Sequence, residues 1–323
     1  MRRPSSFRTG HVPALECRQL LSGNVHATFA HGTLTINGDN SANQLLIQPS
    51  EGGGVRVIAT NGTRLNGVVN GERTFAAPTQ TNIHLLGGDD HLEFWGSSFT
   101  GGLSVWMGGG DDSVVMNVLQ ITGDVMLDFG SGNDSFRTNF YPPVPSSSPS
   151  LANSTSVVRD AVFLDVSLVM GNLTLLGGSG NDKFDISAFS VTGNLKIDSG
   201  SGDDWVNLTR GRTEGTTSIQ LGNGNDTMFF ADRNSTGRVH LDAGSGDDNV
   251  RIFGDFPGRQ VFRQSVEVIL GDGNDTLIDY FNTYESTVTQ NGGRGTDSHG
   301  SVGILPLGSS ILGFEIPLAL GID

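Results

Sequence analysis

Several residue types that define common classes of protein are scarce in this chain. Its 323 residues include one cysteine, Cys17, so neither an intramolecular disulfide nor a cysteine-based metal site can form. There are two lysines, Lys183 and Lys196, and the formal net charge is −15. Nucleic-acid binding needs clustered Lys and Arg side chains, so we expect no nucleic-acid partner and favour cations instead. No apolar run approaches the ~18 residues of a membrane-spanning helix, so we expect no transmembrane segment.

Glycine, in contrast, is abundant. It accounts for 47 of the 323 residues, against a usual share of ~7%, while hydrophobic residues make up 36%. A glycine-rich acidic chain is compatible with disorder. The regular spacing of the apolar residues argues instead for a folded chain.

A 22-residue repeat dominates the sequence. Nine aspartates each close a G-x-G-x-D turn or a close variant of it, and six of the eight gaps between them are 22 residues. These aspartates are Asp90, Asp112, Asp134, Asp182, Asp204, Asp226, Asp248, Asp275 and Asp297. In the longest gap, Asp160 lies 22 residues before Asp182 without the glycines, which predicts a further coil that has lost its turn. A fixed period of this size is typical of a solenoid, in which each repeat is one coil.

Apolar residues recur at four positions relative to each aspartate: nine and seven residues before it, and two and four residues after it. Around Asp182 they are Leu173, Leu175, Phe184 and Ile186. A spacing of two is typical of a strand with one buried face. The sequence therefore predicts an all-β parallel β-helix, or β-solenoid, with 22-residue coils and one Gly-x-Gly-x-Asp turn in each coil.

The chain divides into four predicted segments. Residues 1–23 form an export or leader-like segment, 24–80 an N-terminal cap with eroded first coils, 81–300 the solenoid, and 301–323 a C-terminal capping strand. Asn43 stands where a first aspartate would, with Leu45 and Ile47 at the two apolar positions after it. Loops near 139–150, which is rich in Pro and Ser, and near 254–259 are expected to bulge from the rod.

The turns supply groups that suit a hard cation. Glycine takes the positive φ of a sharp turn at little cost, and carboxylate and carbonyl oxygens are the ligands that Ca²⁺ prefers. One turn offers too few oxygens for calcium, so each ion is expected between stacked turns. Carboxylates stacked ~4.8 Å apart repel by roughly 3–4 kcal/mol at an effective dielectric constant of ~20. The column therefore needs cations, or protons on its acids. Magnesium fits less well because it demands a rigid octahedral geometry.

One turn, Gly177-Gly178-Ser179-Gly180-Asn181-Asp182, resembles the nonapeptide of RTX, or hemolysin-type, calcium-binding repeats. The resemblance implies calcium bound by the turn aspartates and by glycine carbonyls. The predicted ligands are the nine aspartates together with Gly178, Gly180, Gly200, Gly202, Gly222, Gly224, Gly244, Gly246, Gly271 and Gly273. After the last turn, His299 stands where an apolar residue is expected.

The N-terminal segment carries a second resemblance. Residues 15–21, Leu-Glu-Cys-Arg-Gln-Leu-Leu, and the following Ser22-Gly23 are similar to the LEPR-XLL motif of planctomycete-type extracellular proteins, with Cys17 in place of the motif's proline. The resemblance implies export or display on the surface of a bacterium. The segment lacks the apolar core of a secretory signal, so its residues alone do not indicate export.

We expect a secreted or surface-displayed calcium-binding β-solenoid with a structural or adhesive role and no enzymatic activity, whose folding calcium stabilises. A surface polysaccharide or a matrix protein would be its further partner. The alternative is a carbohydrate-active β-helix enzyme, of lyase or hydrolase type, with its site near residues 141–149. Against it, the regular acids single out no catalytic pair, and G-x-S-x-G, P-loop and H-E-x-x-H motifs are absent. A third possibility is a fragment of a larger adhesin-like array.

Overall fold

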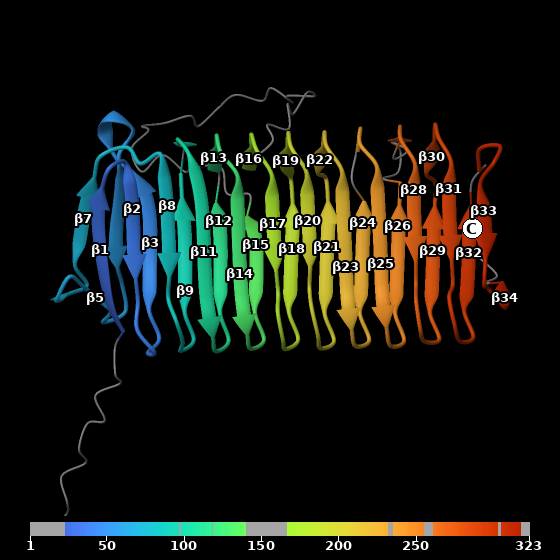
Figure 1. The fold of residues 1–323 in the computed structure, drawn as a ribbon, viewed down its shortest axis with the longest axis horizontal. Helices are drawn as coiled ribbons and strands as arrows, with labels where there is room; N and C mark the ends of the chain where they lie inside the picture. Colours follow the sequence, from blue (N-terminus) through green and yellow to red (C-terminus); the bar gives the residue numbers. More distant parts are fainter. Residues whose placement is uncertain are drawn as a thin grey trace, which may run out of the picture.

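The computed structural model describes residues 23–96, 98–117, 119–139, 167–231, 235–254, 261–302 and 305–317. They form a rod of stacked coils, and the strands run across the rod axis (Figure 1). Two long sheets make the broad faces and a short third sheet closes the cross-section. The predicted parallel β-solenoid is confirmed. Among the described residues, no helix is long and apolar enough to cross a membrane.

The first long sheet contains the strands that lead into the Gly-Asp turns, together with part of the N-terminal cap. In spatial order from the C-terminal end its strands are β33 (Ser310–Leu312), β31 (Val288–Asn291), β28 (Val266–Ile269), β25 (Val239–Ser245), β23 (Thr217–Asn223), β20 (Leu195–Asp198), β17 (Leu173–Leu176), β14 (Val125–Ser131), β11 (Gly102–Gly109), β8 (Gln80–His84), β2 (Thr33–Asn37), β1 (Asn24–Ala30), β5 (Arg64–Leu65) and β6 (Val68–Val69).

The second long sheet contains the strands that follow the turns. In the same direction its strands are β34 (Ile316–Pro317), β32 (Ser298–Val302), β29 (Thr276–Tyr280), β26 (Asn249–Phe253), β24 (Thr227–Ala231), β21 (Trp205–Thr209), β18 (Lys183–Ser187), β15 (Ser135–Asn139), β12 (Ser113–Asn117), β9 (His91–Trp95), β3 (Gln44–Pro49), β4 (Val55–Ala59) and β7 (Glu72–Phe75).

Short strands form the third side of the rod. One group is β10 (Ser98–Phe99), β13 (Leu119–Ile121), β16 (Ser167–Val169), β19 (Phe189–Val191) and β22 (Arg212–Thr213), and a separate pair is β27 (Val261–Phe262) with β30 (Thr283–Tyr284). The described part of the chain has one 3-10 turn, η1 (Glu51–Gly53), in the N-terminal cap.

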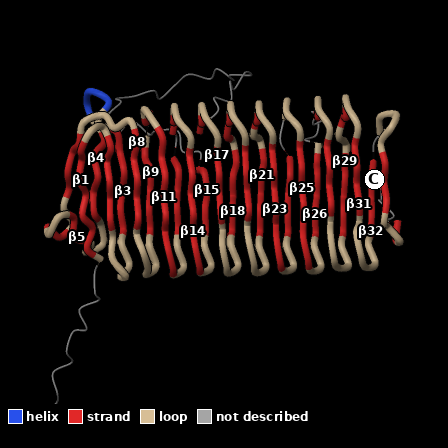
Figure 2. Tube along the Cα trace, in the orientation of Figure 1, coloured by secondary structure: helices blue, strands red, loops and turns tan. Residues whose placement is uncertain are grey.

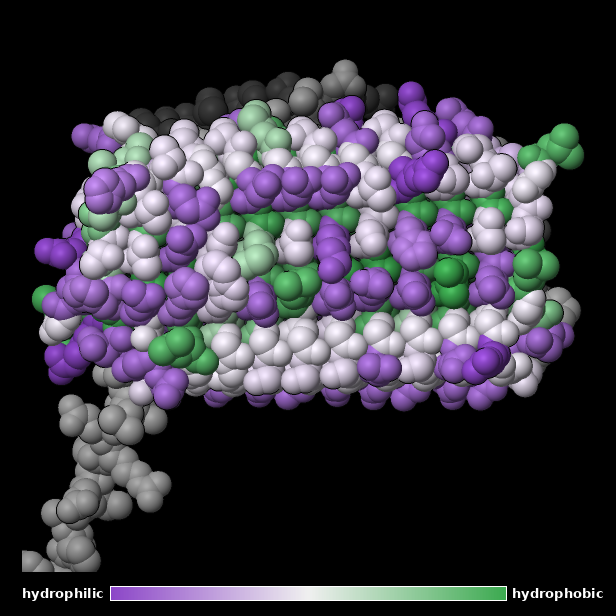
Figure 3. Space-filling model, in the orientation of Figure 1, coloured by the Kyte–Doolittle hydropathy of each residue, from purple (hydrophilic) through white to green (hydrophobic). Residues whose placement is uncertain are grey.

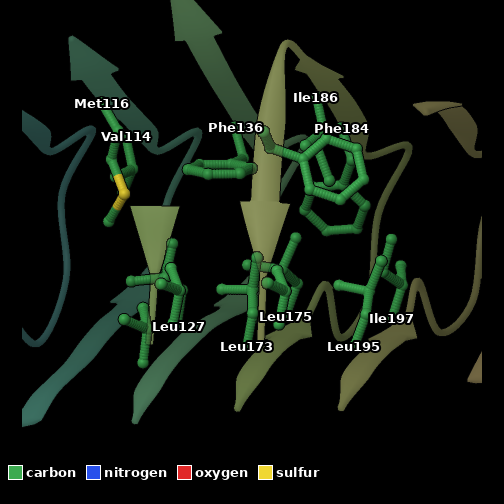
Figure 4. Packing of buried hydrophobic residues seen from close by; sticks show 14 of the residues in the cluster. Val114, Met116, Leu127, Phe136, Leu173, Leu175, Phe184, Ile186, Leu195 and Ile197 are labelled. Atoms are coloured by element: carbon green, nitrogen blue, oxygen red, sulfur yellow. The ribbon is translucent and has the colours of Figure 1, made fainter. Parts of the chain in front are cut away.

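The strand register follows the repeat, so like residues lie over like residues. Leu173 pairs with Leu195 and Phe184 pairs with Val206, each 22 residues further along. Their side chains are buried in a continuous core whose packing is shown in Figure 4. In that core the ring of Phe129 lies 5.6 Å from that of Phe184, measured between centroids. Each such buried side chain stabilises the fold by about 1.5–3 kcal/mol relative to exposure, which is how a chain with few hydrophobic residues sustains a long core.

The predicted coil around Asp160 is wrong. Strand β14 pairs directly with β17, and β15 pairs directly with β18, so the coils of Asp134 and Asp182 are immediate neighbours. Asp160 and the Pro/Ser tract lie outside the described residues, as do residues 255–259 of the loop near 254–259. A proline-rich tract cannot supply the N–H groups that a sheet ladder needs, which is why a period of 22 in the sequence did not produce a coil here.

Different devices close the two ends of the rod. At the N-terminal end β3, β4 and β7 pair antiparallel, and the edge strand β7 carries the charged Glu72 and Arg73. Charges on an edge strand oppose further pairing. At the C-terminal end β33 and β34 continue the parallel stack by one short coil.

The turns require their glycines. Gly244 has φ of 102°, and a Cβ atom there would overlap the carbonyl oxygen of Gly222 in the preceding coil. An L side chain is disfavoured at this φ even without the overlap. The glycines therefore let successive turns stack at the strand spacing.

Candidate metal centre

All the Gly-Asp turns lie along one edge of the rod, the lower edge in Figures 1 and 2. Each turn follows a strand of the first long sheet and leads into a strand of the second. The structure therefore brings the nine predicted aspartates together as a single column.

The carboxylates of this column are buried. Their residues are between 0 and 2% exposed, as in Asp226 (1%) and Asp297 (0%). One oxygen of each accepts a hydrogen bond from the backbone N–H of the aspartate in the preceding coil: Asp204 N to Asp226 Oδ1 is 2.7 Å, and Asp226 N to Asp248 Oδ1 is 2.8 Å. We call this column the inner ladder. Asn43 N donates to Asp90 at its beginning, and Glu315 accepts from Asp297 N at its end.

The second oxygen of every carboxylate in the inner ladder is buried without a hydrogen-bond partner. This is Oδ2 in Asp90, Asp112, Asp134, Asp182, Asp204, Asp226, Asp248, Asp275 and Asp297. A buried oxygen that is neither hydrogen-bonded nor protonated is costly, by about 1–3 kcal/mol and more when it is charged. The column therefore has the capacity to bind either protons or cations.

Burial raises the pKa of these carboxyls. The pKa rises to about 8 for Asp90, Asp204 and Asp248, to about 7 for Asp112 and Asp134, and to about 6 for Asp182, Asp226 and Asp275. For Asp297 burial also raises the pKa. Desolvation of the charged form is the largest cause in every case, and the hydrogen bond from the preceding coil opposes it. At neutral pH the ladder is thus poised between its acid and carboxylate forms.

An exposed outer ladder runs beside the inner one, at the residue before each aspartate. Here the hydrogen bonds run in the opposite direction: Asn225 N donates to Asp203 Oδ1, and Asp247 N donates to Asn225 Oδ1, both at 2.8 Å. From Asn181 to Asn274 this position alternates between Asn and Asp, so no two charges are neighbours there. Repulsion between neighbouring acids of the outer ladder is therefore avoided along this stretch. In the inner ladder, burial together with repulsion from Asp203 and Asp247 still raises the pKa of Asp226 and of Asp248.

In two coils the unpartnered oxygen lies against a glycine. The residue five positions before the aspartate is apolar and buried in most coils, as with Phe129 and Leu221, but it is Gly177 before Asp182 and Gly292 before Asp297. A Cβ atom at Gly177 would lie 2.5 Å from Asp182 Oδ2 and 2.3 Å from the carbonyl oxygen of Ser199, so both oxygens pack against the glycine and no side chain fits there.

The coil of Asp297 repeats this arrangement. At Gly292 a Cβ atom would lie 2.7 Å from Asp297 Oδ2 and would contact Gly313 O. The donor set at these two coils is hard oxygen from a carboxylate and a carbonyl, which suits calcium. Within the described residues no group of three or more His, Cys, Asp or Glu side chains is placed to hold one ion. Calcium there would take its remaining ligands from carbonyls and water.

The predicted glycine ligands have different surroundings. The carbonyls of Gly178, Gly200, Gly222, Gly244 and Gly271, the first glycine of each turn, lie within the column of stacked turns, and those of Gly178 and Gly200 accept the N–H of Ser201 and Asn223 in the next coil. Over the described residues, no backbone N–H donates to the carbonyls of Gly180, Gly202, Gly224, Gly246 and Gly273, the second glycines. The carbonyl oxygens of the second glycines therefore lack a backbone hydrogen bond, but each packs against the equivalent glycine of the next coil.

No protein-family model matches the sequence, and no significant match was found among curated proteins or solved structures. The functional argument therefore rests on the residues of this chain.

Sequence reasoning missed a polar layer in the core near the C-terminal end. Asp279 occupies a column position that is apolar in earlier coils, and it is 2% exposed. Its carboxylate accepts hydrogen bonds from Asn282 Nδ2 (2.6 Å), Tyr284 Oη (2.7 Å) and Gln290 Nε2 (2.7 Å). His299, which the sequence did flag, is the residue paired with Leu277 in the next coil, and burial lowers its pKa. The sequence did carry a signal for this layer, because the position four residues after Asp275 is occupied by Asp279 where most coils have an apolar residue.

We expect Asp279→Leu to destabilise the protein by about 3–5 kcal/mol, because it leaves three buried donors without an acceptor. Replacing the whole layer, with Asn282→Val, Tyr284→Phe and Gln290→Val added, should recover most of that loss. Urea unfolding measures the free energy of unfolding of Asp279→Leu and of the variant with the whole layer replaced. Ile252→Val is the control, and it should cost about 0.5–1.5 kcal/mol. Equal stability of Asp279→Leu and wild type would contradict the assignment.

Proposed function

We propose that this protein is a calcium-binding β-solenoid with a structural or adhesive role outside the cell. The observation that carries the proposal is the inner ladder, in which each buried carboxylate has one oxygen without a partner. A divalent ion supplies that partner and removes the repulsion between neighbouring coils. The coils of Asp182 and Asp297 differ from the others in that a carbonyl oxygen of the next coil and the free carboxylate oxygen both close on a glycine, which places two hard oxygens near each other.

Protons compete with calcium for the same oxygens. The raised pKa values mean that the acid form is accessible near neutral pH. Calcium at millimolar concentration, as found outside cells, would displace protons and stabilise the rod, whereas a calcium-poor cytoplasm would not. Calcium-binding energy would thereby become folding energy after export. The LEPR-XLL-like residues, which lie outside the described part of the chain, support export to the surface of a bacterium through resemblance alone.

The repetitive geometry supports a scaffold more than a catalyst. Stacking gives every coil the same turn, so the acids form a uniform column in place of one distinctive group. The alternative enzyme site near residues 141–149 lies outside the described residues. Adhesion would use the long faces of the rod, with a polysaccharide or a matrix protein as partner.

The test is thermal melting with chelator and with calcium at pH 7.5. Two occupied sites at ~100 times their dissociation constant add about 5 kcal/mol, which should raise the melting temperature by about 7 °C for a chain of this length. Magnesium should produce a smaller shift. An equal melting temperature with chelator and with calcium would contradict the proposal.

Variants of single aspartates localise the ions. Asp182→Asn keeps an acceptor for the N–H of Asp134 and removes the charge, so it should abolish one calcium equivalent in a calorimetric titration. Asp242→Asn removes an outward charge of β25 that is not part of the inner ladder, and it should leave the number of bound calcium ions unchanged. Equal losses in the two variants would contradict binding at the inner ladder.

A further inference from the structure

The two long faces of the rod carry charges of opposite sign. The outward residues of the first long sheet from β14 to β28 include four acids, Asp128, Asp198, Asp242 and Glu267, and one lysine, Lys196. The outward residues of the second long sheet from β15 to β26 include three cations, Arg137, Lys183 and Arg251, and one acid, Asp185. Figure 3 shows how side chains of like polarity gather in rows along the rod. Between β15 and β26 the second face is therefore basic, on a chain whose formal net charge is −15.

One acid lies among the cations of the basic face, since Asp185 is the cross-strand neighbour of Arg137 and stands two residues from Lys183. Among the described residues, none of Arg137, Lys183 and Arg251 makes a salt bridge, whereas Lys196 on the acidic face lies 3.5 Å from Asp198. Arg137 and Lys183 are exposed, and Arg251 is partly exposed. Their charges are thus available to an external anion.

Aromatic rings lie between these cations. Lys183 Nζ is 4.7 Å from the ring centroid of Trp205, and Arg251 Cζ is 5.5 Å from that of Phe229. The two rings are 6.1 Å apart and inclined at 54°. These residues stand on β18, β21, β24 and β26, which are consecutive neighbours in the sheet. With Arg137 on β15 they form a basic–aromatic strip about 19 Å long at the usual strand spacing of ~4.8 Å.

Neutral hydrogen-bonding groups flank the strip. Asn207 Nδ2 donates to Asp185 Oδ1 at 2.8 Å, and Arg251 Nε donates to Asn249 Oδ1 at 3.0 Å. Both amides retain hydrogen-bonding capacity toward solvent, since each is partly exposed. The strip therefore combines separated positive charges, apolar ring surface and amide groups in a line parallel to the rod axis.

We propose that the basic–aromatic strip binds a linear acidic polysaccharide, bearing carboxylate or sulfate groups, that lies along the rod. The cations would pair with the acid groups, the C–H surfaces of the sugar rings would pack on Trp205 and Phe229, and the amides would meet hydroxyl groups. Nucleic acid is a poorer match because its phosphates follow one another more densely than these cations do. The inference specifies the partner for the adhesive role in the proposed function, but it does not depend on calcium at the inner ladder.

The test is calorimetric titration of the folded protein, in calcium and at low ionic strength, with four probes. These are oligogalacturonates too short to gel, chondroitin sulfate oligosaccharides, neutral dextran oligomers and single-stranded DNA. We expect binding of one or both acidic saccharides, weakening as salt is added, and none of dextran. Lys183→Gln combined with Arg251→Gln should lower the affinity about tenfold. Trp205→Thr should lower it as well.

Lys196→Gln is the matched control, because it removes the same charge from an outward strand position on the opposite face, and it should leave the affinity within about twofold. Equal losses in the control and the double variant would overturn the proposal, as would tighter binding of DNA than of either saccharide, or no saccharide binding at all. Asp182→Asn separates the two proposals, since it should reduce the calcium response while leaving saccharide binding unchanged.

Discussion

In the absence of calcium, the protein is expected to lose stability as the pH rises from about 5 to 8. The inner ladder carries carboxyls with pKa values raised to between about 6 and 8, against 3.8 for an ordinary aspartate. The folded state therefore binds more protons than the unfolded state across this interval. Its extra stability is fully present below pH ~3.8 and is lost as the pH passes through the folded-state values.

The size of the effect follows from the number of groups. One unit of pKa difference corresponds to ~1.4 kcal/mol, and mutual interaction between the coils reduces the simple sum to several kcal/mol. We expect the melting temperature of metal-free protein to fall by about 10 °C or more between pH 5 and pH 8. Calcium added at pH 8 should reverse the fall, since the ion replaces the protons. A flat profile, or one that rises with pH, would show that the carboxylates are solvated and not buried.

Substitution of Asp226 by Asn and by Ala is expected to shift stability in opposite directions at pH 8 without metal. Asparagine keeps the acceptor for the N–H of Asp204, which lies 2.7 Å from Asp226 Oδ1, and removes a buried charge. The gain should be about 1–2 kcal/mol, from the relief of desolvation less the cost of placing the new amide hydrogens. Asn43 shows that an asparagine is accommodated at this position of the stack.

Alanine removes both the charge and the acceptor. The N–H of Asp204 would then be buried without a partner, and a small void would replace the carboxyl group, so Asp226→Ala should cost about 3 kcal/mol. Urea unfolding of both variants at pH 8 and at pH 5 measures the difference. At pH 5, where wild-type Asp226 is protonated, the advantage of Asp226→Asn should disappear. Equal destabilisation by both variants would mean that the carboxylate acts by packing alone.

Much of the fold followed from spacing in the sequence. Positions such as Leu175 and Phe184 lie inward because alternation along a strand places every second side chain on one face. The prediction of a coil around Asp160 was wrong because it used the spacing of residues alone. Spacing does not show whether a segment can form the hydrogen bonds of a sheet, and the tract before Asp160 is rich in proline.

The candidate site was less accessible to sequence reasoning. The aspartates end turns, where strand alternation does not apply, so the sequence could not show that they point inward and lose their solvent. Nor could it show that Asp182 Oδ2 and the carbonyl oxygen of Ser199 in the next coil both pack against Gly177. Asp279, Tyr284 and Gln290 come from three different sides of the rod, and only the closed cross-section brings them together.

By itself, the sequence determined the class of fold, the period of the coils and the stacking of the acidic turns, because these depend on local alternation and on the conformational freedom of glycine. The tertiary structure decided which oxygens are hydrogen-bonded, which are left free, and which face of the rod is basic. Those properties arise from contacts between residues a full coil or more apart, and they depend on how closely neighbouring coils approach.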